Sequence, residues 1–578
     1  MKKKSMIRLL TNKITVIGYW VLVIGATTAC SDWTDHYEAD SALLDTQQQT
    51  LWENIASTAN LTQFKTLLQK TGYDAVLNTT QTYTVWAPAD GTYDYEALSA
   101  MNNSRLQREF VENHVARNSY PASGLVEKSL YTINEKLMHF KGNQQYAIQG
   151  IGVSKANLNT HNGILHVLNG KIPFMANIYE SLNNNDFPID SIANYYHSFD
   201  ERKLDESRSI QGPIVDGNIT YLDSVFIERN DLYSNYFAFI NREDSNYTML
   251  VPTNEAWTKA KAKIKQYYKY LPSFEAVETI DGTEMIKSTV TIRDVDSLTE
   301  ATVNNMLMYD LFYNNNLYDN KKLNSLQTGE PLRADSLYST SGTKIYSEDA
   351  ANLFEGAERH NKSNGAIWIT DSLRMQPWNT WNPELIIQAE GRVMDAVNVS
   401  EAKRVYISSG TQNPDVSGKV SRDAYLDLPP IAKGASPSVV FSLPGVRSST
   451  YSIYIVTVPA NILSNYYESK PYCFRVSLGY VDENGKNKDK DRKWCIESQF
   501  VSDPTRVDTI YLGDFTFPMS YYGTGNNFPY MRVECYIRSN FVDVYDPNLR
   551  FDCIILRPKE LDTYMKEHPE YKYDQGNY

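Results

Sequence analysis

The sequence has 578 residues and a formal net charge of −13, with 42% hydrophobic and 22% charged residues, an ordinary globular composition. A chain of this length has room for three or four domains, and so acidic a surface disfavours nucleic acid and anionic lipid as partners. Its 42 tyrosines are unusual, because a stiff ring with a hydroxyl suits surfaces that hold sugars, although abundant β-structure would also explain them.

The chain begins with the layout of a bacterial lipoprotein signal peptide. Basic residues at positions 2–8 precede an apolar run from Ile14 to Ala26, and small residues lie directly before Cys30. The run is shorter than the roughly 20 apolar residues of a spanning helix, which favours cleavage over a single transmembrane anchor. We therefore expect residues 1–29 to be removed and Cys30 to carry the lipid that anchors the protein in the outer membrane.

A polar and acidic segment comes directly after Cys30. Residues 31–40 have no aliphatic stripe, so we expect residues 30–48 to form a flexible tether behind the lipid. Acidic residues at this place also resemble the signal that exports some Gram-negative lipoproteins to the outer face of the outer membrane, although a plain solvated linker would look the same. Residues 1–29 hold five basic residues and no acidic ones, so the chain from Cys30 onward has a formal charge of −18.

Two pairs of segments match each other along the chain. Residues 83–90 (YTVWAPAD) are echoed by residues 247–254 (YTMLVPTN), and residues 161–168 (HNGILHVL) by residues 363–370 (SNGAIWIT). From the tyrosine of the first motif to the asparagine of the second, the spacing is 79 residues in the first copy and 117 in the second. The sequence therefore predicts two copies of one domain, the second enlarged by 38 residues.

Each motif predicts a local structure. The first is a buried strand that Pro88 or Pro252 ends, because proline cannot donate to a ladder, and Asp90 or Asn254 is then placed to cap the next helix. The second is an Asn-Gly turn that leads into a short strand. Apolar residues three and four apart within residues 51–68 add helices, so we expect helices wrapped on a compact sheet.

Together these segments resemble the fasciclin domain, whose signature is a strand of the form Thr-Val-Phe-Ala-Pro-Thr-Asn and, much later, Asn-Gly-Val-Ile-His-Val. The first copy also has His114 where the family carries a Tyr-His pair, whereas Trp368 stands in the second copy where the motif histidine His166 stands in the first. The resemblance implies fasciclin-like domains at residues 49–175 and 176–387. It also implies a module for adhesion and binding rather than catalysis, in which the motif histidine is structural.

The second copy carries two insertions. One covers residues 191–246, and the other is the lysine- and tyrosine-rich segment 259–270 together with the residues just after it. Such insertions could present a surface to a specific partner, or they could be loops that merely tolerate extra length.

From about Gln388 onward, strand-like runs alternate with segments rich in Pro, Gly, Ser and Asn. Six runs read as strands: residues 439–443, 451–458, 472–478, 509–512, 531–537 and 550–556. This spacing predicts an antiparallel β-sandwich at residues 388–560, with a C-terminal tail at 561–578. In architecture alone it resembles the jelly-roll modules of bacterial surface lipoproteins, many of which hold carbohydrate. The predicted fold is thus multidomain α+β, with two fasciclin-like domains before an all-β sandwich.

Four cysteines besides Cys30 fall in the last quarter of the chain: Cys473, Cys495, Cys535 and Cys553. An exported protein can oxidise them. The first two flank an Asp-Glu-Asn-Gly hairpin signal, so they could pair across a ribbon or remain buried free thiols. A bond between the last two is left equally open.

A sugar-binding platform is one interpretation of five aromatic residues in the sandwich: Trp494, Tyr521, Tyr522, Phe528 and Tyr530. The last four lie in a loop rich in Gly and Asn, where flat rings can stack on a pyranose while Asn and Asp bind its hydroxyls. The alternative is that these rings cap the end of the sandwich core.

No sequence motif of catalysis is present. His-Glu-x-x-His, paired Cys-x-x-Cys, Gly-x-Ser-x-Gly and phosphate-binding glycine loops are all absent from the sequence, so we expect no enzyme activity, no catalytic residue and no cofactor. His161 and His166 would point to opposite faces of a strand, so no metal site is expected either.

These features predict a surface lipoprotein, facing the cell exterior, that binds an extracellular glycan or glycopeptide. The resemblances place it beside a TonB-dependent outer-membrane importer of the starch-utilisation type and its partner lipoprotein. One alternative is adhesion to host matrix or to neighbouring cells. The other is a structural subunit packed on the importer, which a broad apolar patch on the fasciclin pair would favour.

Overall fold

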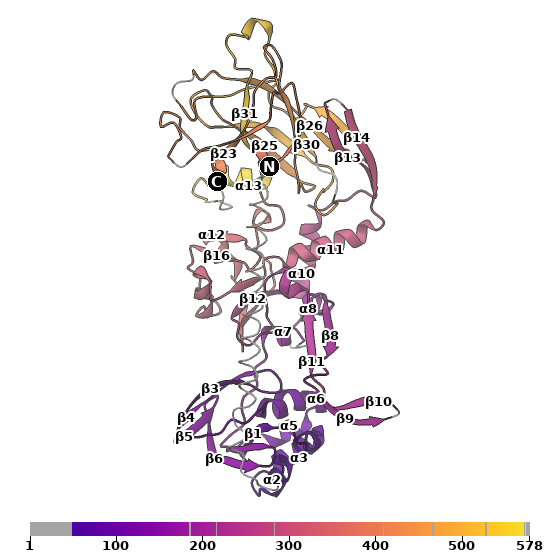
Figure 1. The fold of residues 1–578 in the computed structure, drawn as a ribbon, viewed down its shortest axis with the longest axis vertical. Helices are drawn as coiled ribbons and strands as arrows, with labels where there is room; N and C mark the ends of the chain where they lie inside the picture. The colour runs from indigo at the N-terminus through magenta and orange to yellow at the C-terminus, as the bar shows by residue number, and fades with distance from the viewer. Residues whose placement is uncertain are drawn as a thin grey trace, which may run out of the picture. The chain divides into compact units, whose positions relative to one another are not determined.

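The computed structural model describes residues 49–183, 187–215, 217–282, 284–408, 410–464, 468–525, 529–571 and 573. The predicted signal peptide, Cys30 and the tether lie outside these residues. The chain forms two compact units (Figure 1). The first comprises the chain up to Ala176 with Glu201–Arg229, and the second comprises Asn177–Asp200 with the chain from Asn230 onward. Within the described ranges, no helix has the length and apolar character needed to cross a membrane.

A seven-stranded sheet forms the centre of the first unit, in the order β2-β1-β7-β6-β5-β4-β3. Two neighbouring strands of this sheet, β1 (Tyr83–Pro88) and β7 (Gly163–Leu168), are parallel and buried along their whole length. The remaining strands are β2 (Val115–Arg117), β3 (Leu125–Tyr131), β4 (Leu137–Asn143), β5 (Gln145–Ile148) and β6 (Ile151–Thr160). The strand predicted from the first motif, ending at Pro88, is confirmed.

Helices cover this sheet, as predicted. They are α2 (Leu51–Ser57), α3 (Thr62–Thr71), α4 (Tyr73–Leu77), α5 (Tyr95–Ala100) and α6 (Asn103–Leu106), with the turns η1 (Gln107–Val111) and η2 (Glu112–His114). Neighbouring residues of β1 serve two cores, because side chains alternate across a strand. Val85 packs with Phe64 and other helical side chains, while Trp86 packs with Phe140 on the opposite face.

The second copy repeats this centre in a four-stranded sheet, in the order β15-β12-β19-β18. Strands β12 (Tyr247–Pro252) and β19 (Gly365–Thr370) are parallel, and Tyr247 pairs with Gly365 just as Tyr83 pairs with Gly163. The remaining elements are β15 (Phe312–Asn314), β18 (Glu358–Lys362), β16 (Ser336–Tyr338), β17 (Lys344–Tyr346), α7 (Ile178–Ser181), α8 (Asp190–His197), α9 (Leu232–Asn235), α10 (Asn254–Lys265), α11 (Val295–Met308) and α12 (Ser347–Leu353). The sequence repeat is therefore also a repeat of structure.

Asp90 does not cap the next helix, so that prediction is wrong. Its carboxylate accepts hydrogen bonds of 2.9 Å from the backbone N–H groups of both Thr62 and Gln63, at the start of α3. Asn254 acts alike in the second copy, accepting from the N–H of Ser191 at 2.8 Å near the start of α8. The end of the strand thus reaches the free N–H groups of an earlier helix, while α5 and α10 have caps of their own.

The first insertion contributes two ribbons to the first unit. Strand β8 (Asp200–Leu204) pairs with β11 (Phe226–Asn230), and β9 (Ile210–Val215) pairs with β10 (Asn218–Asp223). Ile210 packs against the core of the first copy, which is why most of this insertion clusters with that unit.

Two six-stranded sheets form the sandwich of the second unit, and every strand pairing in them is antiparallel. One sheet contains β20 (Leu385–Gln388), β22 (Lys403–Tyr406), β23 (Ala424–Leu428), β25 (Thr450–Thr457), β29 (Asp508–Thr516) and β31 (Leu549–Pro558). The other contains β21 (Val393–Val397), β24 (Ser438–Ser442), β26 (Cys473–Val481), β27 (Asn487–Asp491), β28 (Phe500–Val501) and β30 (Tyr530–Cys535). All six predicted strands are present.

The sandwich extends beyond its predicted bounds at both ends. The hairpin of β13 (Ser273–Asp281) and β14 (Glu284–Thr291), which belongs to the second insertion, lies beside β26 and β30 (Figure 1) and places Phe274 in the sandwich core. Residues predicted as a C-terminal tail form most of helix α13 (Lys559–Glu567) and a buried contact at Tyr571. Both additions are packed elements rather than free loops.

Candidate functional site

The two motif histidines of the first copy are buried and hydrogen-bonded at both ring nitrogens. His114 Nδ1 donates to the carbonyl oxygen of Phe110 at 2.7 Å, and its Nε2 accepts from the N–H of Ile172 at 2.9 Å. His166 Nε2 donates to the carbonyl oxygen of Tyr120 at 2.9 Å, and its Nδ1 accepts from a backbone N–H. Both imidazoles are therefore neutral connectors between loops, with no nitrogen available for a substrate or metal.

Acidification is expected to destabilise the first unit through these rings. Burial lowers the pKa of both His114 and His166 to about 4, from an ordinary value of about 6.5. Their contribution to stability is complete above about pH 6.5 and is lost as the pH falls towards 4, because only the unfolded chain takes up protons in that window. We expect a loss of up to about 3 kcal/mol per histidine.

The measurement is the urea midpoint at about pH 7 and about pH 4.5, for the natural chain and for the His114→Gln, His166→Gln double variant. The variant should be less stable at neutral pH but should depend less on pH. An unchanged pH dependence in the double variant would contradict the assignment.

The five predicted platform residues do not form one exposed surface. Tyr521 is 2% exposed, and its hydroxyl accepts from the N–H of Val481 at 2.7 Å inside the sandwich. Tyr530 is fully buried, and its ring lies so close over Gly479 that a Cβ there would be 1.9 Å from it. A buried ring cannot stack on a sugar, so the prediction is wrong for Tyr521 and Tyr530. Phe528 lies outside the described residues.

The other two candidates are half-buried and serve packing. Trp494 donates from its indole nitrogen to the carbonyl oxygen of Asp491 at 3.0 Å and packs edge-on against Phe515. The guanidinium of Arg447 lies 4.9 Å from the centre of the Tyr522 ring. These contacts fit the alternative interpretation, in which the rings cap the core.

The tyrosine-rich insertion joins the second copy to the sandwich. Three tyrosines just after α10 are buried: Tyr267, Tyr268 and Tyr270. The Tyr267 hydroxyl donates to Glu560 at 2.9 Å, and the Tyr270 hydroxyl donates to the carbonyl oxygen of Tyr522 at 2.9 Å. The backbone takes part as well, since Ser520 N–H donates to the Lys269 carbonyl oxygen at 2.7 Å. The side chains and backbone of this insertion therefore make their contacts within the chain. The second copy and the sandwich belong to one compact unit.

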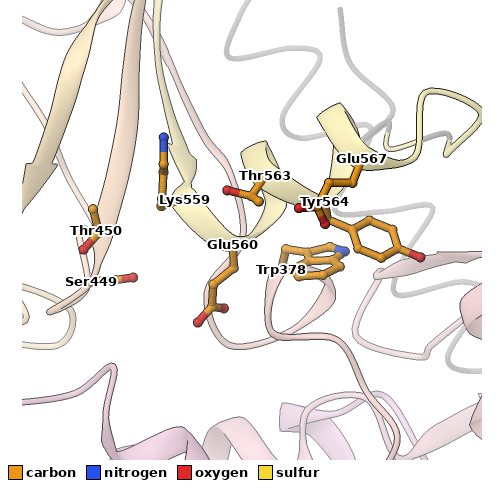
Figure 2. Close-up of a pocket in the computed structure, with 8 residues that line it drawn as sticks. All are labelled: Trp378, Ser449, Thr450, Lys559, Glu560, Thr563, Tyr564 and Glu567. Atoms are coloured by element: carbon orange, nitrogen blue, oxygen red, sulfur yellow. The ribbon is translucent and has the colours of Figure 1, made fainter.

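An open cleft of about 490 Å³ lies at this junction, between α13, the start of β25 and the short helix η4 (Pro377–Asn379). Eight residues line it: Trp378, Ser449, Thr450, Lys559, Glu560, Thr563, Tyr564 and Glu567. Figure 2 shows the Trp378 and Tyr564 rings side by side on one wall, and the Ser449 and Thr450 hydroxyls on the other. The two ring centres are 5.3 Å apart.

The cleft combines apolar rings with exposed polar groups. Trp378 is buried and anchored, because its indole nitrogen donates to the Tyr571 hydroxyl at 2.9 Å. Glu560, Thr563 and Glu567 are exposed along α13, and Glu560 is oriented by the Tyr267 hydroxyl. Lys559 lies 2.7 Å from Asp514, so its charge is already paired. Rings, carboxylates and hydroxyls in one open cleft suit a polar, uncharged ligand with an apolar face, as a sugar has.

Sequence reasoning did not find this cleft, because its lining comes from segments predicted as a domain end and a tail. One signal was available: Leu561, Tyr564 and Met565 have helical spacing, and all three pack with Trp378. The position of Trp378 itself has no local sequence signal, since a tertiary contact with Tyr571 fixes it.

Every cysteine among the described residues is a free thiol: Cys473, Cys495, Cys535 and Cys553. The predicted hairpin between the first two is present, but β27 ends at Asp491, so Cys495 lies beyond the ribbon and not opposite Cys473. Burial raises the pKa of Cys495 and of Cys535 to about 12, which makes these thiols unreactive. The described ranges also contain no group of three or more His, Cys, Asp or Glu residues that could hold a metal ion.

Residues 59–172 match the family model of the Fasciclin domain, so the chain contains such a domain where the motifs of the first copy predicted it. Among solved structures, the chain is similar to the FAS1 domain pair of the insect cell adhesion molecule fasciclin I, with 10% identity and a TM-score of 0.19 over 55% of this chain and 98% of that one. It is also similar to the C-terminal family 22 carbohydrate binding module of Clostridium thermocellum Xyn10B, with 16% identity and a TM-score of 0.15 over 26% and 88% of the two chains. No curated protein matches the chain.

Proposed function

We propose that this protein is a non-catalytic surface lipoprotein, anchored through Cys30 in the outer membrane and facing outward, that captures an extracellular glycan or glycopeptide. In this proposal it serves a TonB-dependent importer and that importer's partner lipoprotein. The cleft beside α13 carries the proposal, because it places the half-buried ring of Tyr564, backed by the buried ring of Trp378, beside exposed carboxylates and hydroxyls (Figure 2). The Fasciclin domain and the lipoprotein-like start of the sequence support a binding role at a cell surface.

The test is a glycan array on the soluble chain that begins at Ser31. Tyr564→Ala should abolish binding of every neutral glycan that the natural chain retains, because it removes one ring of the cleft. Tyr564→Phe should keep at least half of the signal, because stacking needs the ring and not the hydroxyl, and Glu560→Gln should weaken binding by about tenfold through loss of a charged acceptor. An array without hits, or neutral hits that Tyr564→Ala leaves unchanged, would refute capture at this cleft.

One observation favours a protein partner as a second function. The ribbon of β9 and β10 exposes four aliphatic side chains: Ile214, Val215, Ile219 and Leu222, which are 42–70% exposed. Exposed aliphatic side chains of this kind are typical of adhesion or of permanent assembly. A pull-down from detergent-solubilised membranes distinguishes the two functions, because a stoichiometric importer together with an empty array would favour a structural subunit over capture.

A further inference from the structure

The outer face of the sandwich sheet that contains β26 and β30 holds buried polar atoms without partners. Ser477 and Arg532 are directly opposite each other on these two strands and are 1% and 4% exposed. Among the described residues, neither Ser477 Oγ nor Arg532 Nε has a hydrogen-bond partner, and no carboxylate forms an ion pair with Arg532. A largely buried guanidinium without a carboxylate partner is unfavourable, so this position favours an anionic group from outside the described chain.

Two more arginines lie beside this pair. Arg475 precedes Ser477 by two residues on β26 and therefore shares its face of the sheet. Opposite Arg475 stands Glu534, and Arg492 forms an ion pair with that carboxylate. The Nε atoms of Arg475 and Arg492 are also buried and without a hydrogen-bond partner in the described residues. We name Arg475, Ser477, Arg492 and Arg532 the arginine cluster.

The surroundings of the arginine cluster hold it in place. On one side, Tyr530 and Val440 are covered by Val277 and Ile280 of the β13–β14 hairpin. On the other side, the Arg475 guanidinium lies 3.4 Å from the centre of the Tyr536 ring. Arg475 and Arg492 are themselves half-buried, so the cluster reaches solvent at this end. The donors are therefore preorganised. Glu534, which is paired with Arg492, and Asp489, which accepts from the Tyr530 hydroxyl at 3.2 Å, accompany the three positive charges.

We propose that the arginine cluster binds the carboxylate of an acidic sugar, such as a uronic or sialic acid. Guanidinium forks match the two oxygens of a carboxylate, and Ser477 supplies a further donor. The formal net charge of −13 disfavours long polyanions, which favours a sugar with isolated carboxylates over a highly sulfated chain. The inference rests on the proposed function in taking the ligand to be a glycan, but it uses a different surface and so specifies the substrate class separately.

The test is calorimetric titration of the chain from Ser31 with uronic and sialic acid oligosaccharides and with their carboxyl-reduced counterparts. The acidic members should bind at least about tenfold more tightly than the reduced ones. Arg532→Met should weaken the binding of acidic ligands at least about tenfold. It should not lower the melting temperature, because it replaces an unpaired buried charge by an apolar side chain. Arg532→Lys keeps the charge but loses the forked guanidinium, so its affinity for acidic ligands should be weakened as well.

The matched control is Arg506→Met, since Arg506 is an exposed arginine of the same sandwich with ion pairs to Asp503 and Asp508. This variant should bind as the natural chain does. Equal affinity for acidic and reduced ligands, a stronger preference for a heparin fragment, or a melting temperature lowered in Arg532→Met and restored in Arg532→Lys would each overturn the inference. Neutral binding that is lost in Tyr564→Ala, together with acidic binding that Arg532→Met leaves unchanged, would uphold the proposed function and overturn only the role of the arginine cluster.

Discussion

Gly163→Ala is expected to lower the free energy of unfolding of the first unit by more than about 3 kcal/mol. A Cβ at this position would lie 1.9 Å from the carbonyl oxygen of Tyr83 and 2.9 Å from a methyl carbon of Leu51. Tyr83 is the parallel partner of Gly163, so the clash falls on the backbone inside the sheet, where each of the two strands has a neighbour on both sides and cannot move away. The φ of +153° adds strain for any side chain.

Hydrogen exchange measured by mass spectrometry on peptides from β1 and β7 gives the opening free energy of this unit. Gly72→Ala is the matched control, because Gly72 has a φ of +74° but nothing within 4 Å of the position a Cβ would take. It should cost only about 1 kcal/mol. Equal losses in the two variants would show that backbone conformation, and not the close approach of the strands, explains the glycine.

The second copy offers an independent repetition. A Cβ on Gly365 would lie 1.8 Å from the carbonyl oxygen of Tyr247, at a φ of +138°. Gly365→Ala should therefore destabilise the second unit to a similar degree. Gly329→Ala, at a φ of +83° with nothing within 4 Å of the added Cβ, should destabilise it much less.

Asn162→Ala is expected to cost about 3 kcal/mol, because the side chain ties three backbone groups together. Its Oδ1 accepts from the N–H of Leu51 at 2.7 Å, and its Nδ2 donates to the carbonyl oxygens of Leu77 and Thr79 at 2.9 and 2.6 Å. Asn162 is 1% exposed, so alanine would leave buried backbone groups without partners and water could not replace the amide.

The control for this variant is Asn102→Ala, which removes one exposed capping bond to the N–H of Arg105 at the start of α6. That loss should be about 1 kcal/mol, measured in the same hydrogen-exchange experiment. Asn162→Asp should be at least as harmful as Asn162→Ala, since it places a charge against two carbonyl oxygens. A cost for Asn162→Ala no larger than that for Asn102→Ala would contradict the bridging role.

The sequence repeat predicted the centre of each copy well because both motifs act locally. A strand that ends in proline and an Asn-Gly turn need few distant contacts to form, and Asn364 repeats the bonds of Asn162, accepting from Ile178 N–H at 2.9 Å and donating to the Ile240 carbonyl oxygen at 2.7 Å. The replacement of His166 by Trp368 also follows from local packing. His166 pairs with Trp86 across β1 and β7, whereas Trp368 pairs with Leu250 across β12 and β19. The second copy therefore has one large ring at this position of the sheet, where the first copy has a tryptophan and an imidazole.

The candidate site was not predictable from sequence because tertiary contacts decide which aromatic rings are exposed. Tyr521 and Tyr530 lie next to Gly- and Asn-rich stretches, so the sequence predicted that both rings lie at the tip of a loop. In the structure, β30 begins at Tyr530 and the Tyr530 ring packs on Gly479. Arg532 alternates with apolar residues on β30 and gave no sign that its face is covered. The β13–β14 hairpin, which covers part of this face, lies about 250 residues earlier in the sequence. The hydrophobic pattern of a single strand does not predict contacts between segments so far apart.

The hairpin that contributes Phe274 to the sandwich core has a consequence for how this protein can be divided. A sandwich fragment that begins near Gln388 would lack Phe274 and would therefore have a cavity in its core. The remaining N-terminal fragment would expose the Phe274 ring to solvent. During synthesis, the hairpin emerges long before the strands that receive it. Recombination that moved the sandwich alone into another protein would leave part of its interior behind, so inheritance of this module is tied to the domain that precedes it.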